Sequence, residues 1–271
     1  MDPRTSPSPL LSVRGLVKTF MKGARLTGAR VAVRALQSVD LQLQPRQTLA
    51  IVGPSGAGKS TLARCIAGLE QPDAGEVLLH GRQASLKSIH GSVQMIFQDP
   101  GASLNPRFTV AEALLEPWIV RHRAAASAFV AQRLSQVGLP HNALSRLTSQ
   151  LSGGQKARLA IARALTALDA QNAPCVLILD ESLSSLDLSI QAQTINLLID
   201  LQQHCNLSYV LIAHDLGLAA RLADEVVVLC NGCVVERGAP PAVFQKPIHP
   251  QWQALVSATR ALATGRACFD A

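Results

Sequence analysis

The sequence predicts an α/β fold in which buried parallel strands carry helices and a helical block is inserted between them. Short, continuously apolar runs lie at 48–52, 175–179 and 208–213, and each leads into a segment with helical spacing. This pattern is typical of parallel strands that are covered on both faces. From about residue 100 to 150 the pattern changes to helices joined by polar loops, so we interpret that stretch as an insertion in the α/β core.

Composition sets the limits of this prediction. The 271 residues carry 25 Lys and Arg against 18 Asp and Glu, for a net charge of +7, and 48% of them are hydrophobic. These values suit one large domain or two lobes, and exclude a disordered chain or a small disulfide-stapled protein. The basic residues are spread along the chain, so the charge admits nucleic acid, anionic lipid or nucleotide without choosing among them.

No run approaches the roughly 18 to 20 uninterrupted apolar residues that a membrane-spanning helix needs. The first nine residues are polar and Pro-rich, without the apolar segment of a secretory signal. We therefore expect a cytoplasmic protein that does not cross a membrane by itself.

The first third of the chain is predicted to contain two strand types. Residues 10–17 and 31–43 alternate apolar and polar residues, which indicates half-exposed strands, and a basic loop at 21–30 separates them. The buried strand at 48–52 then feeds a helix whose apolar spacing uses Leu62, Cys65, Ile66 and Leu69.

The helical block contains two recognisable helices. Thr109 and Glu112 have the spacing of a capping box at the start of the first helix. Its candidate inward residues are Ala113, Leu114 and Ile119. A second helix at 129–137 is expected to end at Gly138.

Parallel α/β structure resumes at residue 175, with helices predicted at about 189–204 and 216–222. Asn231-Gly232, between valine-rich runs, is a strong signal for a type I′ hairpin. It lies within a Cys-x-x-Cys sequence, Cys230 to Cys233, whose spacing also occurs in redox and metal motifs. No second pair completes a zinc site, so the hairpin interpretation is favoured. All six cysteines are expected to be reduced.

A glycine-rich loop after the first buried strand points to phosphate chemistry. Residues 53–60 match G-x-x-x-x-G-K-[ST] and lie between a strand and a helix. Backbone N–H groups of such a loop surround a β-phosphate, and the helix dipole adds positive potential. Lys59 would reach the β- and γ-phosphates, and the Ser60 hydroxyl would bind Mg²⁺.

Two adjacent carboxylates follow the second buried strand. Asp180, at the strand end, is placed to hold Mg²⁺ directly or through water. Glu181 could orient and deprotonate an attacking water molecule. Leu151-Ser152-Gly153-Gly154-Gln155 precedes a further helix and forms a second candidate anion site, without a lysine of its own.

With these motifs the sequence resembles the ATP-binding cassette (ABC) ATPases over residues 10–240, and LSGGQ is their distinctive signature. The resemblance implies a RecA-like P-loop NTPase core with an antiparallel β subdomain and an inserted α-helical subdomain. We expect an ATPase domain at 10–240, with its α/β core at 10–97 and 156–240 and its helical subdomain at 98–155. A flexible N-terminus at 1–9 and a C-terminal tail at 241–271 complete the division.

The resemblance also implies a site for ATP and Mg²⁺. The Walker A loop would be Gly53, Pro54, Ser55, Gly56, Ala57, Gly58, Lys59, Ser60 and Thr61. The signature residues that meet the nucleotide would be Ser152, Gly153, Gly154 and Gln155. Phe20 would stack on adenine, and Asp187 would be the D-loop aspartate. The catalytic set would be Glu181 as base, His214 as switch histidine and Gln98 of the Q-loop, with Ser60, Gln98 and Asp180 toward Mg²⁺.

A narrower similarity, in 94–106 and 186–193, is to the second ATPase subunit of peptide and nickel importers. It implies head-to-tail pairing with a second ATPase, identical or not, plus two permeases and an extracytoplasmic binding protein. The surface from Gln98 to Trp118 would receive a permease helix, at the cytoplasmic face of the bacterial inner membrane. No nucleic acid partner is expected. The positive charge is expected to favour an anionic membrane surface.

The sequence departs from that subfamily at several points. Ser182 stands where Pro often follows the catalytic Glu, Lys156-Ala157 replaces Arg-Gln after the signature, and the stretch 169–174 is long. The C-terminal four-cysteine cluster of some members is absent, so no iron-sulfur centre is expected. A competing hypothesis is a non-transport ABC ATPase, such as an accessory subunit of a phosphonate-cleaving complex.

Overall fold

The computed structural model of the chain describes residues 8–23, 30–120, 127–168, 174–183 and 187–267. It separates into two compact units, which are taken one at a time below. The first unit comprises 1–43, 47–84 and 211–271, and the second comprises 44–46 and 85–210. Most of the N-terminal segment expected to be flexible, 1–9, lies outside the described residues.

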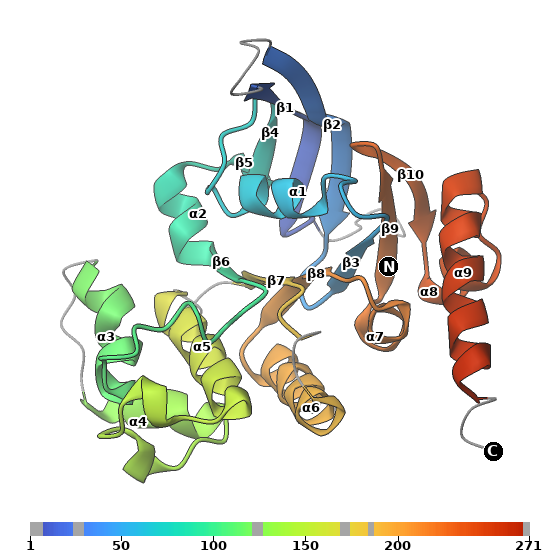
Figure 1. Ribbon diagram of the computed structural model, residues 1–271. Coiled ribbons are helices and arrows are strands. Elements are labelled where there is room, and N and C mark those ends of the chain that lie inside the picture. The colour runs from blue at the N-terminus through green and yellow to red at the C-terminus, as the bar shows by residue number, and fades with distance from the viewer. Residues whose placement is uncertain (1–7, 24–29, 121–126, 169–173, 184–186, 268–271) are drawn as a thin grey trace, which may run out of the picture. The chain divides into compact units, whose positions relative to one another are not determined.

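Figure 1 labels the strands and helices in chain order. The strands are β1 Leu11–Gly23, β2 Arg30–Leu43, β3 Thr48–Val52, β4 Ala74–Leu79, β5 Arg82–Gln83, β6 Val93–Ile96, β7 Cys175–Asp180, β8 Leu207–Ile212, β9 Glu225–Cys230 and β10 Cys233–Gly238. The α-helices are α1 Lys59–Ile66, α2 Leu86–Ser92, α3 Val110–Val120, α4 Ser127–Gln136, α5 Gly153–Ala167, α6 Leu188–His204, α7 Leu216–Leu222, α8 Pro240–Gln245 and α9 Pro250–Ala267. Two short 3-10 turns lie at His141–Ala143 and Thr148–Gln150.

The first unit contains an antiparallel sheet in the order β2-β1-β4-β5. Its long strands extend into the expected loop at 21–30, because Met21 still pairs with Ala32, Lys22 with Val31 and Gly23 with Arg30. The loop prediction was therefore wrong for these ends, and its middle, 24–29, lies outside the described residues. At the start of β1, Leu11, Ser12 and Val13 are all buried, so the predicted alternation fails there. In β2, Leu41 and Leu43 are buried while Gln42 is exposed, which confirms a half-exposed strand.

The first unit also contains β3, which leads into the loop before α1 and lies beside the β9–β10 hairpin in its sheet. β3 is buried along its whole length and runs parallel to β9, which pairs antiparallel with β10. Asn231 and Gly232 have φ angles of 48° and 78°, as a type I′ turn requires at both central positions. The predicted hairpin is confirmed.

Helix α1 ends earlier than its apolar spacing suggested. Leu62, Cys65 and Ile66 are buried, but Leu69 is 52% exposed. Gly68, with a φ of 69°, terminates the helix before the last residue of the apolar pattern can join it.

The C-terminal segment, expected to be a tail, is packed against the first unit. Trp252 of α9 is fully buried, and its indole Nε1–H donates to the Val243 carbonyl at 3.0 Å. The Trp252 ring lies 6.1 Å from that of Phe244, centroid to centroid. Figure 1 shows α8 and α9 beside the β9–β10 hairpin.

Trp252 is therefore expected to contribute strongly to stability. Trp252→Ala removes a buried ring and leaves the Val243 carbonyl without its donor, which should lower the free energy of unfolding by about 3–5 kcal/mol. Ile248→Ala, in the same segment but at a side chain that is 78% exposed, is the matched control. Urea unfolding curves measure both; equal midpoints for the two variants would contradict the packed arrangement.

In the second unit β6 and β7 run parallel, and α3 and α4 pack beside α5. The capping box is confirmed, because Thr109 N–H donates to Glu112 Oε2 at 2.7 Å and Glu112 N–H donates to Thr109 Oγ1 at 3.2 Å. The backbone N–H of Thr109, and its Oγ1–H, which also donates to Glu112 Oε2 at 2.8 Å, lower the pKa of Glu112. Ala113 and Leu114 are buried as predicted, but Ile119 is 66% exposed. It lies five positions after Leu114, about 140° around the helix, so it faces away.

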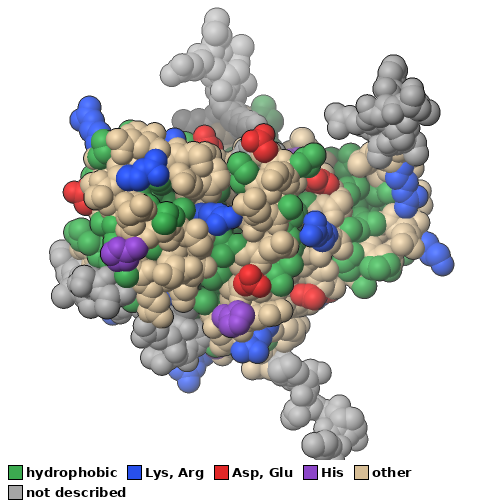
Figure 2. Space-filling view, turned by 90° about the horizontal axis from the view of Figure 1, so that it is seen from below, with side chains coloured by type: hydrophobic (Ala, Val, Ile, Leu, Met, Phe, Trp, Pro, Cys, Tyr) green, Lys and Arg blue, Asp and Glu red, His purple; other side chains and the backbone are tan. Residues whose placement is uncertain are grey.

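No helix in the described part of the chain is long and apolar enough to cross a bilayer. Acidic and basic side chains are interspersed on the face that Figure 2 shows, as their even distribution along the sequence suggests. The five described cysteines are all free, and Cys268 lies outside the described residues.

Candidate functional site

The predicted phosphate loop follows β3 and opens α1, within the first unit. Gly58 is the N-cap residue of α1, has a φ of 103°, and supplies no side-chain cap. A helix start without a capping side chain leaves backbone N–H groups for an anion, and the helix dipole favours negative charge there. The loop therefore has the local structure that a phosphate site needs.

Two glycines of this loop are required by close backbone packing. A Cβ atom on Gly53 would lie 2.0 Å from the Leu229 carbonyl oxygen, and one on Gly58 would lie 2.3 Å from that of Ala35. Neither backbone oxygen can move aside cheaply, so the loop keeps its path only with glycine at both positions.

Lys59 lies across this loop. Its side chain is buried at 4% exposure, and its Nζ donates to the carbonyl oxygens of Gly53 at 2.8 Å and Pro54 at 3.0 Å. The ammonium group is thus held over the loop rather than extended into solvent. A glycine-built cradle with a cation at its centre fits the phosphate groups of a nucleotide.

The β9–β10 turn is hydrogen-bonded to the phosphate loop, a contact that the sequence analysis did not predict. Gly232 N–H donates to the Ala57 carbonyl at 2.9 Å, and its own carbonyl accepts from Gln37 N–H at 2.8 Å. Burial raises the pKa of the Cys230 thiol, while the nearby Lys59 ammonium opposes that shift. The Cys-x-x-Cys sequence thus forms a hairpin that is hydrogen-bonded to the phosphate loop. Its Asn-Gly pair predicted the hairpin but not this contact.

His214 and Phe20 belong to the same unit as the loop. Ala213 N–H donates to the Ile51 carbonyl of β3 at 3.3 Å, so the exposed His214 comes just past the strand that leads into the loop. Phe20 is half-buried on β1 and pairs with Val33 across the sheet.

The predicted carboxylates belong to the second unit. Ile96 of β6 pairs with Leu179 of β7, so Gln98 and Asp180 follow neighbouring parallel strands at the same sheet edge. Asp180 is 6% exposed, whereas Gln98 is exposed. Glu181 has a φ of 52°, a conformation that L-residues adopt rarely and that clusters at functional sites.

The signature segment forms a capping box at the start of α5. Ser152 Oγ accepts from Gln155 N–H at 3.3 Å, and Gln155 Oε1 accepts from Ser152 N–H at 3.1 Å. Gly154 packs so closely on α6 that a Cβ atom would lie 2.9 Å from Ile190 Cγ2. Asp187 is the exposed N-cap of α6, three residues before Ile190 in the chain.

Among the described residues, no group of three or more His, Cys, Asp or Glu side chains could hold a metal ion. The residues predicted for Mg²⁺ all offer oxygen ligands: Ser60 in the first unit, and Asp180 and Gln98 in the second. Hard oxygen donors of this kind suit Mg²⁺, which keeps several waters and binds through few carboxylates.

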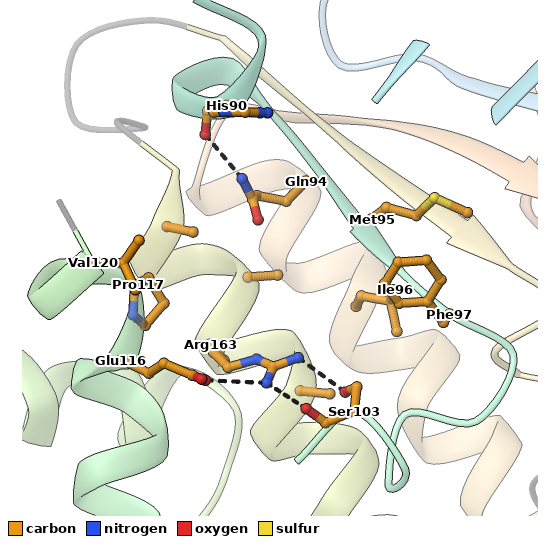
Figure 3. A pocket seen from close by; sticks show the side chains of 13 residues that line it. His90, Gln94, Met95, Ile96, Phe97, Ser103, Glu116, Pro117, Val120 and Arg163 are labelled. Carbon is orange, nitrogen blue, oxygen red and sulfur yellow. Dashed lines mark hydrogen bonds and ion pairs between the residues drawn. The ribbon is translucent and has the colours of Figure 1, made fainter. Parts of the chain in front are cut away.

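A pocket of about 380 Å³ lies within the second unit, beside Gln98. Side chains from β6, α3 and α5 line it, as Figure 3 shows, and we call it the β6–α3–α5 groove. Its lining residues are His90, Gln94, Met95, Ile96, Phe97, Ser103, Glu116, Pro117, Val120, Ala160, Arg163, Ala164 and Ala167.

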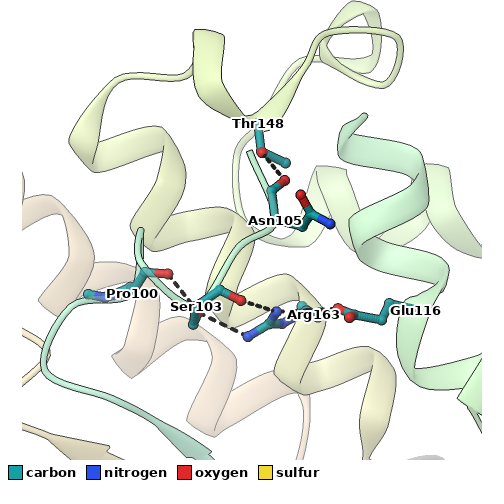
Figure 4. Close-up of polar contacts among 6 residues, drawn as sticks. All are labelled: Pro100, Ser103, Asn105, Glu116, Thr148 and Arg163. Atoms are coloured by element: carbon teal, nitrogen blue, oxygen red, sulfur yellow. Dashed lines mark hydrogen bonds and ion pairs between the residues drawn. The ribbon is translucent and has the colours of Figure 1, made fainter. Parts of the chain in front are cut away.

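Arg163 forms the polar part of this groove. Its guanidinium donates to the Ser103 carbonyl at 2.6 Å and to Ser103 Oγ at 2.9 Å, and it lies 3.4 Å from a Glu116 oxygen (Figure 4). Ser103 Oγ in turn donates to the Pro100 carbonyl at 2.7 Å. These bonds tie the segment after Gln98 to α3 and α5, which the sequence pattern did not indicate.

Comparison with known proteins gives a consistent result. The family model described as ABC transporter matches residues 36–184. The dipeptide transport ATP-binding protein DppF of Haemophilus influenzae is 40% identical, over 94% of this chain and 80% of its own length. The Escherichia coli protein of the same name is 41% identical, over 94% of this chain and 78% of its own.

Solved structures extend the comparison to the fold. One is cbiO1 from Clostridium perfringens, part of the ABC transporter complex cbiONQ, with a TM-score of 0.72 and 26% identity. The match covers 89% of this chain and 92% of that one. Another is the ATP-binding cassette MJ0796, a dimer bound to ADP and Pi, with a TM-score of 0.69 and 26% identity over 85% and 98% of the two chains.

Proposed function

Since this chain belongs to the ABC transporter family, we propose that it is the ATP-binding and ATP-hydrolysing subunit of an importer for peptides. The observation that carries the proposal is the loop at 53–60, where two sterically required glycines and the buried Lys59 form a phosphate cradle. The relatives named for dipeptide transport, at about 40% identity over most of the chain, support peptides as the cargo.

ATP binding uses the phosphate loop and Phe20. Lys59 exchanges its two loop carbonyls for phosphate oxygens, and backbone N–H groups from Gly56 to Thr61 hold the β-phosphate. Phe20 stacks on adenine. Ser60, Asp180 and Gln98 would hold Mg²⁺, which would supply positive charge to the phosphates when bound.

Glu181 acts as the general base for hydrolysis. Its carboxylate accepts a proton from the attacking water molecule and orients that water toward the γ-phosphate. His214 contacts the γ-phosphate and stabilises the charge that develops there. Glu181 directly follows the buried strand β7, and His214 lies two residues past the buried strand β8, which supports these roles.

A complete site requires a second ATPase subunit in head-to-tail contact. In that pairing Ser152, Gly153, Gly154 and Gln155 of one subunit cover the phosphate loop of the other, and Asp187 lies at the same junction. The MJ0796 cassette, a relative in fold, is dimeric. The proposal covers a second copy of this chain and a non-identical ATPase alike as the second subunit.

The β6–α3–α5 groove receives a helix of a partner permease at the cytoplasmic face of the inner membrane. Its lining combines apolar side chains with polar ones, among them the oppositely charged Arg163 and Glu116. Such a groove suits an amphipathic helix.

A charge on the groove wall should separate transport from ATP binding. Val120 lines the groove and is 73% exposed, so Val120→Asp leaves the fold intact but buries a carboxylate when the permease docks. Peptide uptake by the assembled importer should fall by roughly tenfold or more, with ATP affinity unchanged. Ile248→Asp, at an exposed apolar residue outside the groove, is the control, and equal uptake by both variants would refute this docking site.

The proposed function is tested by reconstitution with its permeases in vesicles. ATP-dependent accumulation of a labelled dipeptide is the expected result, and accumulation of Ni²⁺ instead would reassign the cargo to nickel. Recovery of the chain only with soluble enzymes, and no uptake, would favour an accessory role in a phosphonate-cleaving complex.

A further inference from the structure

A lysine that no assigned role uses contacts the ring proposed to stack on adenine. Lys18 lies two residues before Phe20 on β1, and its Nζ is 5.3 Å from the centroid of the Phe20 ring. At that distance an ammonium group attracts an aromatic ring electrostatically. Both residues belong to the first unit, as does the phosphate loop.

The ammonium group of Lys18 is held in place by the turn that follows α1. Its Nζ lies 2.7 Å from Glu70 Oε1 and 3.5 Å from Asp73 Oδ1, and it donates to the Gln71 carbonyl at 2.6 Å. The side chain is only 11% exposed. These three partners together fix the Lys18 ammonium group beside the Phe20 ring.

The same turn binds the backbone of β1 on both sides of Lys18. Asp73 N–H donates to the Val17 carbonyl at 2.8 Å, and Thr19 N–H donates to Asp73 Oδ2 at 2.6 Å. Helix α1 begins in the phosphate loop at Lys59 and ends four residues before Glu70. One short helix and its turn therefore connect the phosphate cradle to the strand that carries Phe20.

We propose that Lys18 is a positioning residue for base recognition: clamped by Glu70 and Asp73, it fixes the Phe20 ring in the orientation that stacks on the adenine of ATP. This inference rests on the proposed function, because it needs Phe20 to meet the base. A fixed ring loses less rotational freedom when the base stacks on it, so Lys18 raises affinity without touching the nucleotide. The hydrogen bond with Glu70 raises the pKa of Lys18.

The test compares two ligands that share phosphates but not the base. Calorimetric titrations of the full chain use ATP and inorganic tripolyphosphate, each with Mg²⁺. Lys18→Met should weaken ATP binding by about fivefold and leave tripolyphosphate binding unchanged. Lys18→Arg, which keeps a cation at that position, should restore most of the ATP affinity.

Two controls make the result specific. Arg14→Met removes a cation from the same strand. The Arg14 guanidinium pairs with Glu76 at the surface, so this variant should change the affinity for neither ATP nor tripolyphosphate. In a Phe20→Ala background, Lys18→Met should have no further effect on ATP binding, because the ring it positions is gone.

Several outcomes would overturn the inference. Equal loss of ATP and tripolyphosphate affinity would mean that Lys18 acts on the phosphates or on the fold of the loop. An unchanged ATP affinity in Lys18→Met, or an undiminished effect in the Phe20→Ala background, would remove the link to the ring. If the unmodified chain bound no ATP at all, the proposed function itself would fail, which is a separate result.

Discussion

Glu181→Gln is expected to reduce ATP turnover by about a thousandfold while ATP binding persists, because the amide cannot accept the proton of the attacking water. The substitution keeps the size of the side chain and one of its two acceptor oxygens, so it suits the half-buried position after β7. Steady-state phosphate release measures turnover, and titration with ATP measures binding.

The same variant should accumulate as an ATP-bound dimer, since hydrolysis is the step that separates the pair in the proposed cycle. Size-exclusion chromatography with ATP and Mg²⁺ should show a shift to twice the mass. Glu76→Gln, at a surface glutamate paired with Arg14, is the matched control and should stay active and monomeric after turnover. Normal hydrolysis by Glu181→Gln would sink the assignment of the base.

Lys59→Ala should weaken nucleotide binding by about 30- to 100-fold, the loss expected for charge-assisted hydrogen bonds to phosphate. The buried ammonium is the positive group at the centre of the cradle, and its removal also leaves the Gly53 and Pro54 carbonyls without that donor. ATP and tripolyphosphate should lose affinity in parallel, because Lys59 meets phosphates and not the base.

That parallel loss distinguishes Lys59 from Lys18, whose replacement should affect ATP alone. Lys87→Ala, at an exposed lysine of α2, is the control for a general effect of charge. A Lys59→Ala variant that binds ATP as tightly as the unmodified chain would contradict the phosphate-cradle interpretation. Thermal unfolding of each variant checks that the loop has not lost its fold.

Much of the fold followed from local patterns. The buried strands at 48–52 and 175–179, the capping box at Thr109 and the Asn-Gly hairpin are all present, since each depends on residues adjacent in the chain. Errors arose where distant packing acts. The apolar pattern alone did not show that Ile119 is exposed, or that Trp252 of the C-terminal segment is buried in the core.

The sequence by itself determined that this chain carries a phosphate loop, a signature segment and a pair of strand-end carboxylates. Each is a run of consecutive residues whose chemistry lies in its own backbone and order. Only the tertiary structure decided which distant residues hold parts of the site in place. Gly232 is hydrogen-bonded to the phosphate loop, and Glu70 and Asp73 hold Lys18 beside Phe20. These contacts join residues 50 or more positions apart, and their energy depends on distances and burial that exist only once the chain has folded.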